Sequence, residues 1–165
     1  MLHWYGVVVG VAAVCWWSMA EYLEPKLKKV IPTILVLSLV GARIYHFFEY
    51  LEYYQMDIMA ILRVWEGGLS IWGALLLGGG YTVIFARNMI WAVVTPLPLA
   101  QAVGRLANYI NSEFTNPVLG IPWWGMEAML DLILFVIIWH TKKEWRVGVY
   151  LFGYGLIRLV LAPYR

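Results

Sequence analysis

Six long apolar segments alternate with short polar stretches along this chain of 165 residues. They cover about residues 2–19, 31–48, 67–85, 89–110, 125–139 and 147–162. Each approaches the roughly 20 residues that cross the hydrocarbon core of a bilayer. Pro96 and Pro98 interrupt the fourth segment, which predicts a kink or a locally unwound turn there. The pattern therefore predicts an all-α, polytopic bundle of six transmembrane helices that forms a single integral membrane domain over residues 1–165.

Two stretches depart from a plain transmembrane pattern. Residues 49–66 are amphiphilic and acidic, with Arg63 as their single basic residue, and we expect them to lie along the membrane surface. Residues 67–80 contain six glycines, and small residues let helix backbones approach closely in a bilayer. Helix packing is the favoured interpretation of the glycines at 67–73, and the alternative is that they let backbone amides approach a phosphate ester.

The composition supports a membrane protein and excludes several other classes. Hydrophobic residues make up 62% and charged residues 13% of the chain, whereas soluble domains average about 25% charged residues. The single cysteine, Cys15, excludes an internal disulfide, and no zinc-type Cys/His spacing occurs. The sequence also has no P-loop and no basic stripe for nucleic acid. We expect no metal, no cofactor and no nucleic-acid partner, and a first helix that is retained rather than removed as a signal peptide.

Basic residues set the expected orientation. Seven of the twelve Lys and Arg residues follow the first, third and fifth segments. They are Lys26, Lys28, Lys29, Arg87, Lys142, Lys143 and Arg146. Because cytoplasmic loops carry an excess of positive charge, these loops are predicted to be cytoplasmic and both termini to lie outside.

Three arginines lie inside apolar segments: Arg43, Arg105 and Arg158. A charged side chain at membrane depth needs a partner or a polar cavity. In the predicted topology all three reach the outer half of the membrane, so we expect one shared cavity. Three interpretations remain open: ion pairs with Glu113, Glu127 and Asp131, a site for an anionic lipid headgroup, and a transport pathway. Transport is disfavoured because no chain of acidic groups crosses the bilayer and no internal repeat is evident.

Several ordered motifs carry a resemblance to a known family. They read LHWYG at 2–6, GARIYH at 41–46, RVWEGGLS at 63–70, GRLANYINSE at 104–113, and YGLIR at 154–158. Pro122-Trp123 and Met126-Glu127 add the entry to the fifth segment. With these motifs the chain resembles the prolipoprotein diacylglyceryl transferases, also called phosphatidylglycerol:prolipoprotein diacylglyceryl transferases, along nearly its whole length.

The resemblance implies a reaction and a location. The diacylglyceryl group of phosphatidylglycerol would be transferred to the thiol of a lipobox cysteine in a prolipoprotein, with release of glycerol-1-phosphate. The expected partners are phosphatidylglycerol, the prolipoprotein lipobox peptide and membrane lipids. The expected location is the bacterial inner membrane, with the site toward the outer leaflet, and the reaction needs neither metal nor nucleotide.

The resemblance also implies roles for particular residues. The expected catalytic residues are Arg105, Arg158, Glu113, Asn108 and Tyr5. The expected substrate-binding residues are Arg43, His46, Gly67, Gly68, Trp72, Gly73, Asn111, Glu127 and Tyr154.

The chain departs from the family pattern at several positions. Trp72 stands where many members have a histidine proposed as the base for the thiol, which leaves Glu113 and His46 as candidate bases. Ala162 stands where the family usually has glutamate, and Asn116 where it has glycine. The family's final helix and most of its outer head region are expected to have no counterpart. An alternative function is therefore a catalytically inactive relative that binds phosphatidylglycerol or presents prolipoproteins.

Overall fold

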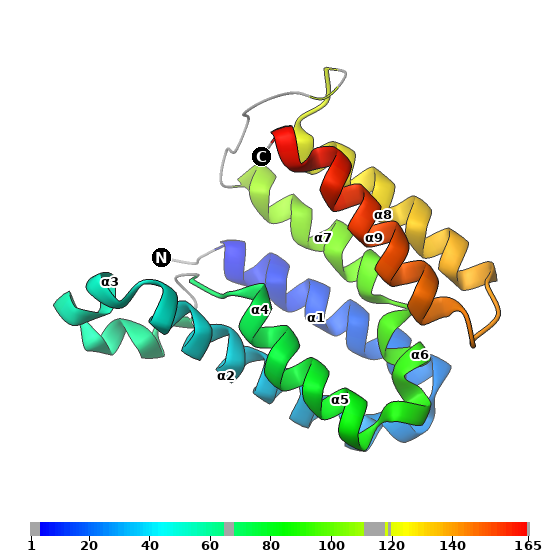
Figure 1. Ribbon diagram of the computed structural model, residues 1–165, viewed down its shortest axis with the longest axis horizontal. Helices are drawn as coiled ribbons and strands as arrows, with labels where there is room; N and C mark the ends of the chain where they lie inside the picture. Colours follow the sequence, from blue (N-terminus) through cyan, green and yellow to red (C-terminus); the bar gives the residue numbers. More distant parts are fainter. Residues whose placement is uncertain (1–3, 65–67, 111–117, 119, 165) are drawn as a thin grey trace. The chain divides into compact units, whose positions relative to one another are not determined.

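Every regular element that the structure describes is a helix (Figure 1). The structure is a computed structural model that describes residues 4–64, 68–110, 118 and 120–164. It divides into two compact units, and each is described by itself. The terminal unit comprises Met1–Pro25 and Trp91–Arg165, and the middle unit comprises Lys26–Ile90. The predicted all-α class is confirmed for these residues.

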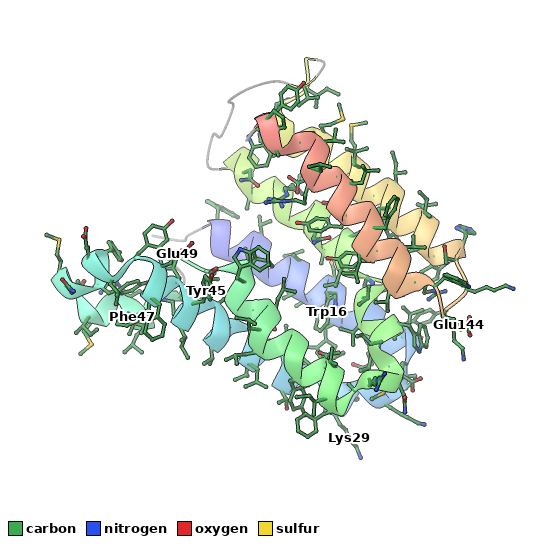
Figure 2. The ribbon with its side chains drawn as sticks, viewed as in Figure 1. Trp16, Lys29, Tyr45, Phe47, Glu49 and Glu144 are labelled. Atoms are coloured by element: carbon green, nitrogen blue, oxygen red, sulfur yellow. The ribbon has the colours of Figure 1, made fainter. Side chains whose placement is uncertain are left out.

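The terminal unit is built around helix α7. Its elements are α1 (Trp4–Leu23), α6 (Ile90–Val94), α7 (Leu97–Ile110), α8 (Trp123–His140), α9 (Arg146–Leu161) and η6 (Ala162–Tyr164). Helix α7 packs against both α1 and α8, and α9 packs on α8. Leu134, Ile138, Ile157 and Leu161 form a buried apolar cluster between α8 and α9. The indole Nε1 of Trp16, which Figure 2 labels, donates to a carbonyl of α6 over 2.8 Å and so ties α1 to α6.

The middle unit consists of one long helix and a broken helical run beside it. Its elements are η1 (Pro25–Lys29), α2 (Ile31–Glu49), α3 (Leu51–Met56), η2 (Ile58–Leu62), α4 (Ile71–Ala74), η4 (Leu75–Gly79), α5 (Gly80–Phe85) and η5 (Arg87–Met89). Element η4 is a π-helical turn that joins α4 to α5 without a break. The run packs along α2, with most of the contact made by α4 and η4.

Glycines allow the close packing of α2 against this run. A Cβ at Gly41 would collide with the carbonyl oxygen of Gly73, and a Cβ at Gly73 would collide with that of Gly41. A Cβ at Gly78 would collide with Oγ of Ser38. Gly73 and Gly78 are five residues apart, which in a regular α-helix would place them on different faces. Because the π-helical turn accommodates one extra residue, both face α2. The helix-packing interpretation of the glycine run is thus confirmed at these positions.

The predicted interruption of the fourth segment is also confirmed. Helix α6 ends at Val94, and α7 begins at Leu97 after a turn that contains Pro96. Proline has no N–H and cannot continue the helical hydrogen bonds, whereas Pro98 is tolerated because it lies in the first turn of α7.

Four helices are long and apolar enough to cross a membrane: Gly6–Leu23, Ile31–Glu49, Trp123–His140 and Arg146–Tyr164. The bent pair Ile71–Phe85 and Arg87–Val94 adds a fifth if it forms one span. Helix α7 has 14 residues and is only about 21 Å long, short of the roughly 30 Å hydrocarbon core. The described residues therefore give four or five spans, and the expected count of six stays a prediction.

Candidate functional site

Three helices of the terminal unit turn polar side chains toward one another. Residues four apart share a helix face, and this spacing relates Gln101 to Arg105 on α7 and Glu127 to Asp131 on α8. On α9 the same spacing relates Tyr150, Tyr154 and Arg158. Helix α8 runs back alongside α7 (Figure 1), so the two pairs lie in two layers.

The first layer is charged and centres on Glu127. This carboxylate has 0% exposure and accepts a hydrogen bond from Nη2 of Arg105 over 2.9 Å. Nη1 of Arg158 makes a second ion pair with the same oxygen, Oε1, at 3.7 Å. The Arg105 guanidinium also lies 5.9 Å from the ring centre of Trp123. The side chains of Arg105 and Arg158 remain 20% and 42% exposed, so both arginines are accessible from outside the cluster.

The second layer is polar and incompletely hydrogen-bonded. Nε2 of Gln101 donates to the hydroxyl of Tyr150 over 3.0 Å, and the Tyr150 and Tyr154 rings stack 5.7 Å apart. Asp131 has 0% exposure, and neither of its carboxyl oxygens has a hydrogen-bond partner in the described part of the chain. The same holds there for Oε1 of Gln101 and Nε of Arg105. Buried polar atoms without hydrogen-bond partners are rare in proteins, so this layer is a locally destabilising feature of the apolar bundle.

The charged layer has the chemistry of an anion site. A guanidinium offers a planar fork of donors that suits phosphate oxygens. The layer formed by Arg105, Glu127 and Arg158 holds two guanidinium groups and one carboxylate, and the second buried acid, Asp131, lies in the neighbouring layer. Within the described ranges, no three His, Cys, Asp or Glu side chains are grouped to hold a metal ion.

A second polar cluster lies in the middle unit around Arg43. This buried guanidinium donates to the carbonyl oxygens of Ile61 at 2.9 Å, Gly68 at 2.8 Å and Arg63 at 3.3 Å, and also to that of Ala60. These carbonyls come from η2, from Arg63 directly after it, and from the residues just before α4. Arg43 therefore holds the segment after α2 against α2 itself.

His46 and Gly68 complete this second cluster. Nδ1 of His46 is hydrogen-bonded to the hydroxyl of Tyr54, which is fully buried, over 2.8 Å. Gly68 has a φ of +69°, and a Cβ there would lie 2.6 Å from Nη1 of Arg43. Trp72, the second residue of α4, is 62% exposed.

The expected site residues divide between the two units. Arg105, Glu127, Tyr154 and Arg158 lie together in the terminal unit, with Asn108 one turn after Arg105 on α7. Arg43, His46, Gly68, Trp72 and Gly73 lie in the middle unit. Gly67, Asn111, Glu113 and the side chain of Tyr5 lie outside the described residues. One cavity shared by both groups stays a prediction.

Sequence reasoning did not assign Gln101 and Tyr150 to the site, and it treated Asp131 only as a counter-ion. The sequence does contain a signal for the first two residues, which is the four-residue helical spacing extended by one turn. Gln101 precedes Arg105 by four residues, and Tyr150 precedes Tyr154 by four.

Comparisons with known proteins identify the family. A family model described as prolipoprotein diacylglyceryl transferase matches residues 1–165. The phosphatidylglycerol–prolipoprotein diacylglyceryl transferase of Synechococcus sp. (strain CC9902) is 31% identical, over 96% of this chain and 74% of that protein. The protein of the same name from Brucella ovis is 26% identical, over 99% of this chain and 75% of that protein. The chain belongs to the prolipoprotein diacylglyceryl transferase family, a family of membrane transferases of lipoprotein biosynthesis.

The matched region is longer in the relative than in this chain. The match to the Synechococcus protein extends over 207 residues, whereas this chain has 165. The relative therefore carries internal segments that have no counterpart here.

Proposed function

We propose that this protein transfers the diacylglyceryl group of phosphatidylglycerol to the lipobox cysteine of prolipoproteins. The observation that carries the proposal is the pair of arginines, Arg105 and Arg158, joined on Glu127 in a chain of this family. The names of the relatives give both substrates, phosphatidylglycerol and prolipoprotein. No metal or nucleotide takes part in the proposed reaction.

The reaction requires an anion site of this kind. The cysteine sulfur attacks the glyceryl carbon that bears the phosphate, so a C–S bond forms and the C–O bond to phosphate breaks. The phosphate leaves with the headgroup as glycerol-1-phosphate, and the thiol proton passes to a phosphate oxygen or to water. Arg105 and Arg158 stabilise the negative charge that develops on the leaving phosphate. A positive local field also favours the thiolate form of the attacking cysteine.

Other residues take supporting roles in this proposal. Glu127 holds both guanidinium groups in place through the contacts at 2.9 Å and 3.7 Å. Asn108, Tyr5 and Glu113 orient the headgroup or the peptide, and Glu113 or His46 serves as the base if one is needed. Arg43 positions the segment that contains Gly68 through its contact with the Gly68 carbonyl, and Gly67 and Asn111 complete the substrate-binding surface.

The proposed topology places this chemistry at the outer leaflet of the bacterial inner membrane. Six crossings with both termini outside put the basic loops in the cytoplasm. In this arrangement the α6–α7 segment forms the fourth crossing, with its break at Pro96 filled by neighbouring helices.

Transfer can be tested directly with the purified protein. The protein is incubated with phosphatidylglycerol and a lipobox peptide, while glycerol phosphate release and peptide mass are measured. We expect a peptide heavier by one diacylglyceryl group. Arg105→Ala should reduce turnover by about 100-fold or more, as loss of an electrostatic stabiliser does. Arg87→Ala, which removes an exposed arginine of η5, is the matched control and should retain activity. Unchanged turnover in Arg105→Ala would contradict the site.

One observation favours the second function, an inactive relative that binds phosphatidylglycerol or presents prolipoproteins. Trp72 replaces the histidine expected as the base, and an indole cannot accept the thiol proton. If the protein binds phosphatidylglycerol but lipidates no peptide, the inactive function is correct. The variant Trp72→His distinguishes the two functions further, because a large gain in turnover would show that the unmodified site lacks a base. If the unmodified protein is active and Trp72→His does not change its turnover, the thiol proton leaves by another route.

A further inference from the structure

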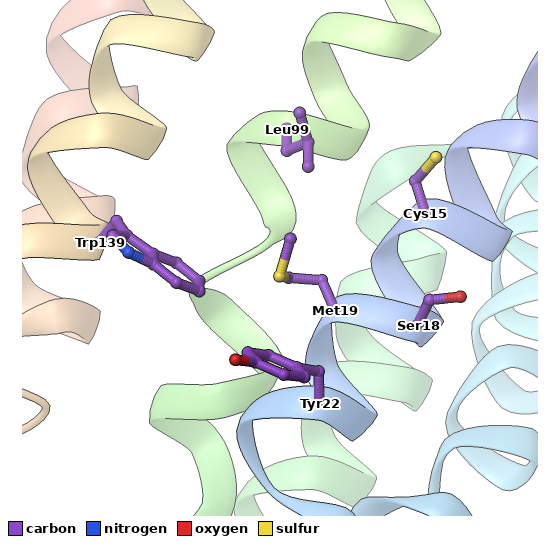
Figure 3. Close-up of a pocket in the computed structure, with 6 residues that line it drawn as sticks. All are labelled: Cys15, Ser18, Met19, Tyr22, Leu99 and Trp139. Atoms are coloured by element: carbon purple, nitrogen blue, oxygen red, sulfur yellow. The ribbon is translucent and has the colours of Figure 1, made fainter.

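An apolar groove lies at the end of the terminal unit opposite the charged layer. Its larger part has a volume of about 460 Å³ and is lined by Cys15, Ser18, Met19 and Tyr22 of α1, Leu99 of α7 and Trp139 of α8. Met19 and Tyr22 point toward the Trp139 ring, and Leu99 lies between α1 and α8 (Figure 3). A smaller part of about 200 Å³ shares Met19 and Trp139 and adds Phe135, Val136 and His140.

The groove exists because α7 is shorter than its neighbours. Helix α7 lies between α1 and α8 but has 14 residues, against 20 in α1 and 18 in α8. Leu99 is only two residues after its start, so α7 does not fill the space between the far ends of α1 and α8.

The position of the groove along α8 decides which lipid can fill it. Glu127 lies one turn after the start of α8, and Trp139 is its penultimate residue. The two residues are about 18 Å apart along the helix axis, at 1.5 Å per residue. One leaflet contributes only about 15 Å of the hydrocarbon core. The Trp139 end of the groove is therefore farther from Glu127 than the depth of one leaflet, which favours a lipid that enters from the leaflet in which α8 ends.

Basic residues in the loop that follows α8 favour one class of lipid. Lys142 and Lys143 follow the end of α8 at His140 and the intervening Thr141, and both side chains are exposed. Ammonium groups just beyond the end of a membrane helix attract anionic headgroups. Tyr22, Trp139 and His140 add the aromatic side chains that favour the interface.

We infer that this groove is a second phospholipid site, distinct from the proposed substrate site. It binds one acyl chain of an anionic glycerophospholipid from the leaflet in which α8 ends, with the phosphate beside Lys142 and Lys143. The inference does not depend on the proposed transferase activity, because it rests on the groove, its depth and its charge alone.

Photo-crosslinking in nanodiscs tests this site. The full chain is placed in phosphatidylcholine nanodiscs that contain a trace of one probe with a photoreactive acyl chain. The probe is either phosphatidic acid or phosphatidylcholine with the same chain, and adducts are mapped by mass spectrometry. We expect adducts at Cys15, Met19 and Trp139, with a clear excess from phosphatidic acid. Each lysine should contribute about fivefold to this excess, since a basic residue near an anionic surface supplies that factor.

Paired variants separate headgroup from chain recognition. The double variant Lys142→Gln, Lys143→Gln should abolish the excess of phosphatidic acid adducts and leave labelling by phosphatidylcholine unchanged. The control Arg87→Gln should retain the excess. Leu99→Trp fills the groove and should reduce labelling by both probes at least threefold, whereas Leu132→Trp, on an exposed part of α8, should not. Equal labelling by both probes in the unmodified protein, or an excess that survives the lysine changes, would overturn the inference.

Discussion

Glu127 is the residue on which the charged layer depends. It is fully buried and is the shared partner of Arg105 and Arg158, which come from two different helices. Removing one member of a buried ion pair leaves the other charge uncompensated, which costs more than the pair contributes. Asp131, one turn further along α8, is equally buried but has no hydrogen-bond partner among the described residues. The two carboxyl groups thus provide a matched comparison at nearly the same depth.

The first prediction concerns these two acids. Glu127→Gln should lower the free energy of unfolding by about 3–5 kcal/mol and abolish transfer, because it separates both arginines from their partner. Asp131→Asn, which is nearly isosteric, should change stability by less than about 1 kcal/mol, because it removes no hydrogen bond or ion pair. Thermal unfolding in detergent and the transfer assay measure both effects. A larger loss in Asp131→Asn than in Glu127→Gln would show that the unpartnered carboxyl is the functional one.

The second prediction concerns two glycines with positive φ. Gly68 has a φ of +69° and Gly120 has a φ of +80°, so alanine strains the backbone at both by about 1–2 kcal/mol. At Gly68 the new Cβ also lies 2.6 Å from Nη1 of Arg43 and 2.9 Å from Cε1 of His46, whereas nothing lies within 4 Å at Gly120. Gly68→Ala should therefore cost about 1–3 kcal/mol more than Gly120→Ala. Equal shifts in melting temperature would mean that Arg43 and His46 do not constrain Gly68.

At the scale of elements, the contact of α2 with the α4–η4–α5 run gives the third prediction. Gly78→Ala places a Cβ against Oγ of Ser38 and should cost about 1–3 kcal/mol through overpacking. Its neighbour Gly79 has nothing within 4 Å, so Gly79→Ala should stabilise the helix by about 0.5–1 kcal/mol. Adding Ser38→Ala removes the nearest atom and should restore part of the stability lost in Gly78→Ala. Chemical denaturation in mild detergent measures the series, and equal effects at both glycines would contradict the π-helical register.

The short helix η2 gives the fourth prediction, a dependence on pH. Nη2 of Arg63, just after η2, donates to Oδ2 of Asp57, just before it, over 2.5 Å, and this hydrogen bond lowers the pKa of Asp57. A carboxyl group with a lowered pKa stabilises the folded segment above its unfolded pKa, about 3.9, and this stabilisation is lost as pH falls through the folded pKa. Hydrogen exchange of residues 58–62 should therefore accelerate as pH falls below about 4, after correction for intrinsic rates.

Two variants check the source of this acid sensitivity. Asp57→Asn should show the faster exchange already at neutral pH and lose the step on acidification. Glu52→Gln, a change at an exposed acid of α3 in the same region, should keep the step. An unchanged step in Asp57→Asn would assign the titration to another group.

At the scale of the whole molecule, the sequence was sufficient for local features and insufficient for packing. The all-α class, the break at Pro96 and the glycine contact follow from the chemistry of the chain alone, and the structure confirms each in the described residues. Of the six predicted segments, it gives four or five candidate spans. The sequence named Glu127 among the possible partners of the buried arginines, but it could not choose among them, because the pairing depends on helix register across sequence-distant elements. Arg43 is an example: the sequence places it in an apolar segment, but only the fold shows that four backbone carbonyls surround it.

The count of membrane crossings is the fifth prediction, and it concerns the path of the whole chain. In a Cys15→Ser background, single cysteines at Lys29, Arg87 and Glu144 report three exposed loop positions, two of which Figure 2 labels. With six crossings and outside termini, all three cysteines lie inside and resist a membrane-impermeant thiol reagent in intact cells. With four crossings, Arg87→Cys lies on the opposite side from Lys29→Cys, because α2 returns the chain across the membrane. With five crossings, Glu144→Cys lies on the opposite side instead, since the bent pair then counts once. Met56→Cys, an exposed position after α2, is the positive control for the outer side, because two crossings precede it in all three topologies. Labelling of either Arg87→Cys or Glu144→Cys would reject the six-helix topology.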